Sequence, residues 1–268
     1  MQSQVTGFMF AVSLAIPVTL ALGSTGLARA DTVTTGALSA QTAGSGINDD
    51  GDVIPVSTGY YAAAFDSTTG GTVGGVNFTA FPGKNGTGSG GMVTLANFGH
   101  DYTGYFTSAV TTGDSALDAV LKGGNYADTT SVGQITFNNL TAGQGYEVQF
   151  LVVDNRSSQI GRSVQISNNS SFSNAGSGSY ASPAIEYAVG GSPSVGSYVD
   201  WVFVANSTSQ TFYDELTNIN SSSTQFGTPQ GTQINALIIT PTPEPASMAL
   251  LGLGAASMLF LRRRRQAH

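Results

Sequence analysis

The sequence predicts an all-β protein: an antiparallel β-sandwich of the jelly-roll type with one short capping helix, placed between an N-terminal signal helix and a C-terminal transmembrane helix. Three observations predict this arrangement. Apolar and polar residues alternate along many short segments, which is the period of a half-buried strand. Gly, Ser and Asn separate these segments, as in the turns of antiparallel sheets. Longer apolar runs occur near the two ends of the chain.

The composition of the 268 residues excludes several classes of protein. The chain contains no Cys, so it is neither a disulfide scaffold nor a holder of Cys-ligated zinc. Its net charge of −7 argues against a nucleic-acid partner, which needs a basic surface. With 40% hydrophobic residues, it is too apolar for a disordered acidic chain.

Residues 1–30 are predicted to be a signal peptide. The segment 7–22 is mostly apolar, and Ala28-Arg29-Ala30 precedes Asp31 in the A-x-A pattern that signal peptidase cleaves, with Ala28 and Ala30 at the small-residue positions. The segment before the apolar run has no Lys or Arg, so an uncleaved anchor helix is the alternative. Pro17 and the small residues favour cleavage. We therefore expect an exported chain that begins at Asp31.

Residues 31–240 are predicted to form the extracellular β-sandwich domain. Strands are predicted at 76–81, 134–140, 146–154, 162–166, 184–189, 199–205, 211–216 and 234–240. Ile135 and Phe137 share one face of the second of these strands. Residues 141–145 are expected to join two strands as a hairpin-like turn. We expect a loose leader at 31–52 and a long polar loop at 217–233.

One segment has the pattern of a helix. Asp114 is a capping residue, Leu117, Val120 and Leu121 follow helical spacing, and two glycines then end the pattern. We expect this helix to cap one end of the sandwich. The domain around it carries fifteen acidic and four basic residues, a net charge of −11. Such a surface repels polyanions and suits a hydrated matrix.

Two polar clusters are candidate ligand sites. Asn48, Asp50 and Asp52 place oxygen atoms at alternate positions, which suits Ca²⁺. The loop departs from the EF-hand pattern, because Val53 stands where the glycine belongs and Gly59 where the bidentate glutamate belongs. A solvated turn rich in Asn and Asp is therefore the favoured interpretation.

The second cluster is Asp154, Arg156 and Arg162 between two predicted strands. The arginines are forked donors that suit a sugar or carboxylate. The favoured alternative is structural, with Asp154 pairing with an arginine to clamp the loop. Aromatic residues that either stack on a sugar or pack in the core are Tyr60, Tyr61, Tyr102, Tyr105 and Phe106.

No catalytic constellation is evident. His100 is the only histidine of the domain, and no G-x-S-x-G motif accompanies it. Glu147 and Glu186 resemble a glycosidase pair only in residue type, since both lie on the polar side of predicted strands. The sequence thus predicts no enzymatic activity and no cofactor, with calcium as the one ion to consider.

Residues 241–268 have three parts in strict order. Pro243-Glu244-Pro245 comes first, sixteen uncharged residues at 246–261 follow, and Arg262 to Arg265 form a basic cluster. As a helix the apolar run is about 24 Å long, a short transmembrane span. The positive-inside rule places Arg262, Arg263, Arg264 and Arg265 in the cytoplasm, so the domain before them lies outside.

This tail resembles the PEP-CTERM sorting signal of Gram-negative bacteria that make extracellular polysaccharide. The resemblance implies that an exosortase, a membrane-embedded enzyme, cleaves near the tripeptide. The region from Asp114 to Arg162 also resembles a β-sandwich region of secreted PEP-CTERM proteins. That resemblance rests on Gly113-Asp114, Leu117-Asp118, Leu140-Thr141-Ala142-Gly143, Tyr146, Asp154, Arg156 and Arg162.

Together these observations predict an exported protein of the cell surface or extracellular matrix. Its predicted partners are signal peptidase, an exosortase, the membrane through the C-terminal helix, and extracellular polysaccharide, with a structural role for the domain. The alternative is a carbohydrate-binding module of the cell surface. In both cases the tail tethers the domain to the membrane until processing.

Overall fold

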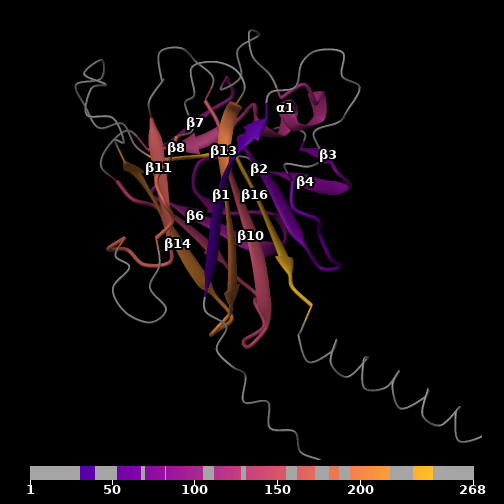
Figure 1. The fold of residues 1–268 in the computed structure, drawn as a ribbon, viewed down its shortest axis with the longest axis vertical. Coiled ribbons are helices and arrows are strands. Elements are labelled where there is room, and N and C mark those ends of the chain that lie inside the picture. Colours follow the sequence, from indigo (N-terminus) through magenta and orange to yellow (C-terminus); the bar gives the residue numbers. More distant parts are fainter. Residues whose placement is uncertain are drawn as a thin grey trace, which may run out of the picture.

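The computed structural model describes residues 31–39, 53–67, 70–81, 83–104, 112–127, 131–154, 162–172, 181–186, 194–217 and 232–243. These residues are mostly β-strands in sheets, with α1 as the α-helix among them (Figure 1). The predicted signal peptide, the predicted transmembrane helix at 246–261 and the candidate calcium ligands lie outside the described residues. Within them, no helix has the length and apolar character needed to cross a membrane.

The larger sheet has seven strands in the order β1-β13-β10-β16-β2-β4-β3. Neighbouring strands are antiparallel except β2 and β4, which are parallel. The bounds are β1 Thr32–Ser39, β13 Ser194–Val204, β10 Gly145–Val152, β16 Ala236–Pro241, β2 Tyr61–Phe65, β4 Val76–Phe81 and β3 Gly71–Val73.

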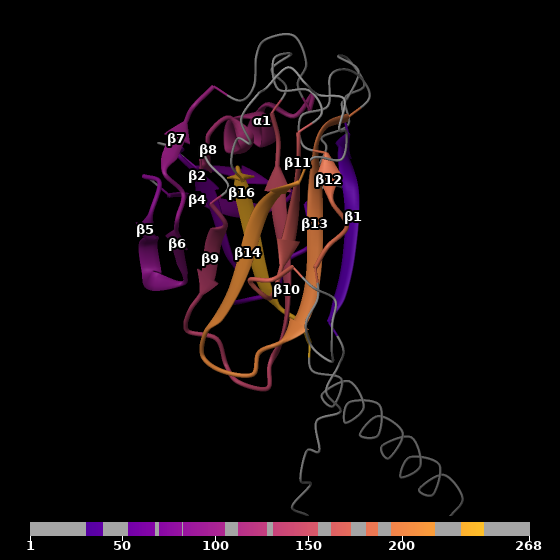
Figure 2. The same cartoon turned by 90° about the vertical axis from the view of Figure 1, so that its left-hand side faces the viewer.

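The second sheet has six strands in the order β12-β11-β14-β9-β6-β5 and faces the first (Figure 2). Its bounds are β12 Ile185–Glu186, β11 Ser163–Ser167, β14 Gln210–Thr217, β9 Gly133–Phe137, β6 Val93–Ala96 and β5 Gly86–Thr87. A three-stranded sheet joins β15 Gln233–Ile234, β8 Gly124–Tyr126 and β7 His100–Tyr102. We call the end of the molecule that carries α1 the upper pole, and the end where β1 begins and β16 ends the lower pole (Figure 1).

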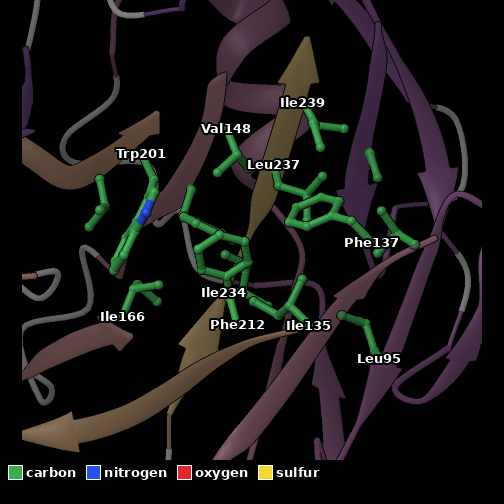
Figure 3. Packing of buried hydrophobic residues seen from close by; sticks show 14 of the residues in the cluster. Leu95, Ile135, Phe137, Val148, Ile166, Trp201, Phe212, Ile234, Leu237 and Ile239 are labelled. Atoms are coloured by element: carbon green, nitrogen blue, oxygen red, sulfur yellow. The ribbon is translucent and has the colours of Figure 1, made fainter. Parts of the chain in front are cut away.

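The main hydrophobic core fills the space between the two sheets (Figure 3). Ile135 and Phe137 of β9 are buried in it, as the alternating pattern predicts. Trp201 and Phe212 come from facing sheets and meet edge to face, with ring centroids 5.2 Å apart. Such aromatic pairs favour one fixed geometry, so they help to set how the sheets lie on each other.

A second core covers the outer face of the seven-stranded sheet. The predicted helix is confirmed as α1, Ser115–Leu121, with Leu117, Val120 and Leu121 buried. The carboxylate of Asp114 caps it by accepting a hydrogen bond from the Ala116 amide at 2.7 Å. The helix packs on β2 and β3 at the upper end of that face. It therefore covers a sheet face and does not close the gap between the sheets.

The helix packs on this outer face because strands beneath it are apolar on both faces. In β2, Ala63 and Phe65 face the main core, whereas Ala62 and Ala64 face the second core. A strand of this kind is stable only when both faces are covered. The helix and the segment at 53–56 provide the cover.

The prediction of a hairpin at 141–145 is wrong, because β9 and β10 belong to different sheets. The segment passes from one sheet to the other and is held by the β13–β14 connection, since the Gly143 amide donates to the Ala205 carbonyl at 2.7 Å. The Tyr146 hydroxyl accepts a hydrogen bond from the Thr141 amide at 2.9 Å, as in the tyrosine corner of β-sandwiches. The crossing lets the apolar faces of β9 and β10 meet across the core.

Two further expectations need correction. The first part of the supposed leader is an edge strand, β1, which pairs with β13 from Thr32 opposite Val202 onward. The strand predicted at 234–240 is interrupted at Asn235, between β15 and β16. Both differences arise from tertiary pairing and not from local pattern.

Candidate functional site

Polar side chains with no exposure to solvent gather where β10 and β14 end, at the upper pole. Asp154, Asp214, Thr232 and Asn235 are each fully buried, and Gln233 is nearly so. Burying polar groups is costly unless they are paired. This cluster is therefore either a structural network or a candidate site.

The predicted residues Asp154 and Arg162 flank one connection at this pole. Asp154 lies two residues after the end of β10 and is fully buried, and Arg162 directly precedes β11 and is half-buried. Arg156 lies outside the described residues. Complete burial of Asp154 agrees better with the loop clamp than with a contact to an external sugar, because a ligand needs an accessible carboxylate.

Asn235 connects three segments of the upper pole. Its side-chain oxygen accepts a hydrogen bond from the Val153 amide at 2.7 Å. Its side-chain nitrogen donates to the carbonyls of Leu121 at 3.1 Å and Gly123 at 2.9 Å. Since the last carbonyls of a helix lack partners within the helix, Asn235 both completes α1 and joins it to β10.

Asp214 is the least compensated group of the cluster. Neither of its carboxyl oxygens has a hydrogen-bond partner among the described residues. Burial raises the pKa of Asp214 well above its usual value; the Thr232 hydroxyl opposes the rise, and the charge of Glu215 adds to it. Thr232 is close but does not reach hydrogen-bonding geometry, so the folded protein favours a neutral Asp214 carboxyl.

The other predicted site residues are not brought together. Glu147 lies in β10 of the larger sheet, opposite Thr240 near the lower pole. Glu186 lies in β12 of the other sheet, opposite Ser163 near the upper pole. The structure therefore does not form the carboxylate pair of a glycosidase from these two residues.

The aromatic candidates are also dispersed. Tyr61 packs against the main core, and Tyr60 packs against the second core on the opposite side of the sheet. His100 stacks on Tyr126 with ring centroids 5.1 Å apart. Tyr102 is exposed, whereas Tyr105 and Phe106 fall outside the described residues. Among the residues that the structure describes, no three His, Asp or Glu side chains form a group that could hold a metal ion.

At the lower pole, the end of β16 is tied to two turns. The Ser57 hydroxyl donates to the Pro241 carbonyl at 2.7 Å. The Thr242 amide donates to the Gly145 carbonyl at 2.9 Å, and the Gln144 side chain donates to the Thr242 carbonyl at 2.7 Å. Pro243 follows directly and is exposed. The last hydrogen bonds that the structure describes in this segment are therefore those of Thr242, directly before the Pro-Glu-Pro tripeptide.

Comparison with known families identifies this segment. The family model of the PEP-CTERM protein-sorting motif matches residues 241–265. The chain carries a PEP-CTERM sorting motif. The match spans Pro243, Glu244, Pro245 and the four arginines Arg262 to Arg265, which confirms the resemblance of the tail. It indicates an exported protein that an exosortase sorts, with a membrane-anchored sorting signal.

The other comparisons add little to the PEP-CTERM assignment. No curated protein matches the chain. Among solved structures, the K1 cleaved adhesin domain of Lys-gingipain from Porphyromonas gingivalis W83 is similar at 9% sequence identity. The alignment covers 79% of this chain and 99% of the adhesin domain, with a TM-score of 0.28. A likeness at that TM-score carries no argument about fold or function.

Proposed function

We propose that this protein is a non-enzymatic component of the cell surface or extracellular matrix, delivered by its PEP-CTERM tail. The observation that carries the proposal is the junction at Thr242. The last hydrogen bonds of the domain and the first residue of the sorting tripeptide are adjacent in sequence. Removal of the tail at the tripeptide therefore leaves the strands of the domain complete.

We further propose that the domain is a jelly-roll β-sandwich. Eight strands support this, in two antiparallel groups with the orders β2-β16-β10-β13 and β9-β14-β11-β12. Taken in chain order, this arrangement agrees with the two interlocked four-stranded sheets of a jelly roll, which supports the proposal. The strands β1, β3, β4, β5 and β6 then extend the edges of the two sheets.

A structural role within exopolysaccharide is the function we propose for the domain. Its net charge of −11 between residues 31 and 240 favours hydration and keeps it apart from polyanions. The separation of Glu147 from Glu186 and the burial of Asp154 support a role without catalysis. The proposed final location is the surface or matrix of a Gram-negative bacterium.

Deletion of residues 243–268 tests the sorting. In cells that contain an exosortase, the full chain should lose its tail, and mass spectrometry should find a C-terminus near Pro243. The truncated chain should pass into the medium without membrane retention. A chain lacking only residues 266–268 is the matched control and should behave as the full chain. Identical fractionation of the truncated and full chains would contradict the proposal.

The matrix role needs a separate measurement. In a strain that makes no exopolysaccharide, we expect the processed domain to move from the cell-associated fraction to the medium. Affinity electrophoresis of the purified domain through the same polysaccharide should show no retardation. Retardation would replace the structural role with the alternative of a carbohydrate-binding module, and unchanged fractionation would refute any association with the polysaccharide.

A further inference from the structure

The two ends of the domain leave it at the same pole. Thr32 pairs with Val202, Val202 pairs with Glu147, and Glu147 pairs with Thr240. The first residue of β1 and the next-to-last residue of β16 therefore lie on one line across four strands. At the usual spacing between strands they are about 14 Å apart. The start of β1 and the end of β16 both lie at the lower pole in Figure 1.

Three turns surround the point where the chain leaves the domain, and we call them the lower-pole turns. They comprise residues 57–60, 141–144 and 206–209. Ala205 and Gln144 join two of them by backbone hydrogen bonds, and Ser57 joins the third to Pro241. Most of their residues are exposed, and none of the twelve is charged.

This absence of charge differs from the rest of the domain, whose net charge is −11. The acidic groups nearest the turns are Glu147 and Asp31. The Asp31 carboxylate already accepts hydrogen bonds from the Trp201 indole at 3.1 Å and from Asn168 at 2.9 Å. Asp66 directly follows β2, and Asp114 and Asp118 belong to the cap and first turn of α1, so these acidic groups lie toward the upper pole. The eight residues of β10 separate the two poles by about 27 Å.

The length of chain between the domain and the apolar run is short. Thr242 is held by Gly145 and Gln144, and the uncharged run begins at Ala246. Thr242 and Ala246 are separated by four peptide units, which span at most about 14 Å when fully extended. The polar layer on each side of a bilayer is about 5–8 Å thick. A tail inserted from Ala246 therefore holds Thr242 within about 6–9 Å of the headgroup surface, even when the connection is fully stretched.

We propose that the lower-pole turns are the face that this domain lays against the phospholipid headgroups while its tail is in the membrane. The proposal rests on the proposed function in one respect, the insertion of the tail. Uncharged Ser, Thr, Asn and Gln side chains hydrogen-bond to headgroups without the repulsion that carboxylates meet at an anionic surface. The acidic groups of the upper pole lie about three Debye lengths from the headgroups, so salt screens most of their repulsion. In this orientation the upper pole faces away from the membrane.

The absence of Cys from the chain makes a direct test simple. Ser207→Cys places a fluorophore on the lower-pole turns, and Ser115→Cys is the matched control at the upper pole. Both positions are exposed serines. The exported chain, Asp31 to His268, is reconstituted into vesicles of phosphatidylcholine and phosphatidylglycerol that carry a quencher on some headgroups. Because these vesicles hold no exosortase, failure of processing cannot affect the result.

We expect several-fold stronger quenching at position 207 than at position 115. Insertion of twenty Gly and Ser residues between Thr242 and Pro243 lets the domain move about 25 Å away and should abolish the difference. Equal quenching at both positions, or a difference that the insertion leaves unchanged, would overturn the proposal. A chain that does not sediment with the vesicles would refute tail insertion, the premise shared with the proposed function.

Discussion

Asp200 makes the stability of the domain depend on pH between about pH 4 and pH 6. It lies in β13 opposite Gln149, on the outer face of the larger sheet. Burial raises its pKa to about 6, a hydrogen bond from the Gln149 side chain lowers it, and the charge of Glu147 raises it further. The perturbation that tests this reasoning is Asp200→Asn, which keeps the shape of the side chain and removes the charge.

The raised pKa of Asp200 determines whether the stability of the domain rises or falls with pH. The folded state holds the Asp200 proton more tightly than the unfolded chain, whose pKa is near 3.8. The destabilisation caused by Asp200 is therefore absent below about pH 4, grows as the pH rises, and reaches its full size above about pH 6. About two pKa units correspond to about 3 kcal/mol, which screening at a half-buried site reduces to about 1–2 kcal/mol. Asp200→Asn should recover that amount at pH 7.5 and nothing at pH 4.

Thermal unfolding at several pH values measures the effect. At pH 7.5 the variant should melt about 2–8 °C above the wild type, on the usual relation between free energy and Tm for a domain of this size. Glu147→Gln should raise the melting temperature by less, because it removes only one of the causes that raise the pKa of Asp200. Equal destabilisation of Asp200→Asn at every pH, or parallel curves for variant and wild type, would refute the reasoning.

Three further predictions concern buried hydrogen bonds. Asn235→Ala should lower the free energy of unfolding by about 3 kcal/mol or more, because it leaves one amide and two carbonyls without partners; denaturant titration measures this. Asp31→Ala should cost about 1–3 kcal/mol, because the indole of Trp201 loses its acceptor, and the fluorescence of this sole tryptophan follows the unfolding. Tyr146→Phe should cost about 1 kcal/mol through loss of the bond from Thr141, and its melting temperature should fall.

Control substitutions at exposed positions show whether a loss of stability comes from the buried hydrogen bonds or from a general sensitivity of the domain to mutation. Asn206→Ala changes an exposed asparagine and is the control for Asn235→Ala; it should leave the free energy of unfolding nearly unchanged. Thr34→Ala changes an exposed residue of β1 and should be nearly neutral beside Asp31→Ala. If the control and the test variant of either pair lose equal stability, the assigned hydrogen bonds do not have the importance given to them.

Local patterns predicted much of the fold. Alternation places Ile135 and Phe137 in the core, and helical spacing identifies α1 to within one residue at each end. These patterns work because one buried face imposes a period on the sequence. They do not identify the sheet to which a strand belongs, and for that reason the crossing at 141–145 was predicted as a hairpin.

Strand β1 and the short strands β3, β5, β7 and β8 escape sequence reasoning for a different reason. They are edge or accessory strands rich in Gly, Thr or polar residues, and partner strands hold them in place. In β1, for instance, the pairing with β13 is non-local. A pattern of buried residues is too weak in such segments to indicate a strand.

Sequence reasoning singled out only one member of the buried polar cluster at the upper pole, Asp154. It was noticed because arginines, among them Arg162, follow it in one connection between predicted strands. Asn235 and Asp214 of the same cluster were not noticed. The signal for Asn235 is a lone amide in an otherwise apolar run, and the signal for Asp214 is a carboxylate two residues after the inward-facing Phe212. An inward position in a strand pattern that holds a polar residue therefore indicates a buried network.

The place of β16 in the sheet has a consequence for the order of events during export. This strand pairs with β10 on one side and β2 on the other, so the sheet is incomplete until residue 241 has crossed the membrane. The strand that completes the sheet is followed within a few residues by the uncharged run of the PEP-CTERM sorting motif. If that run is the predicted membrane span, we expect completion of the fold and arrest at the membrane to be consecutive steps.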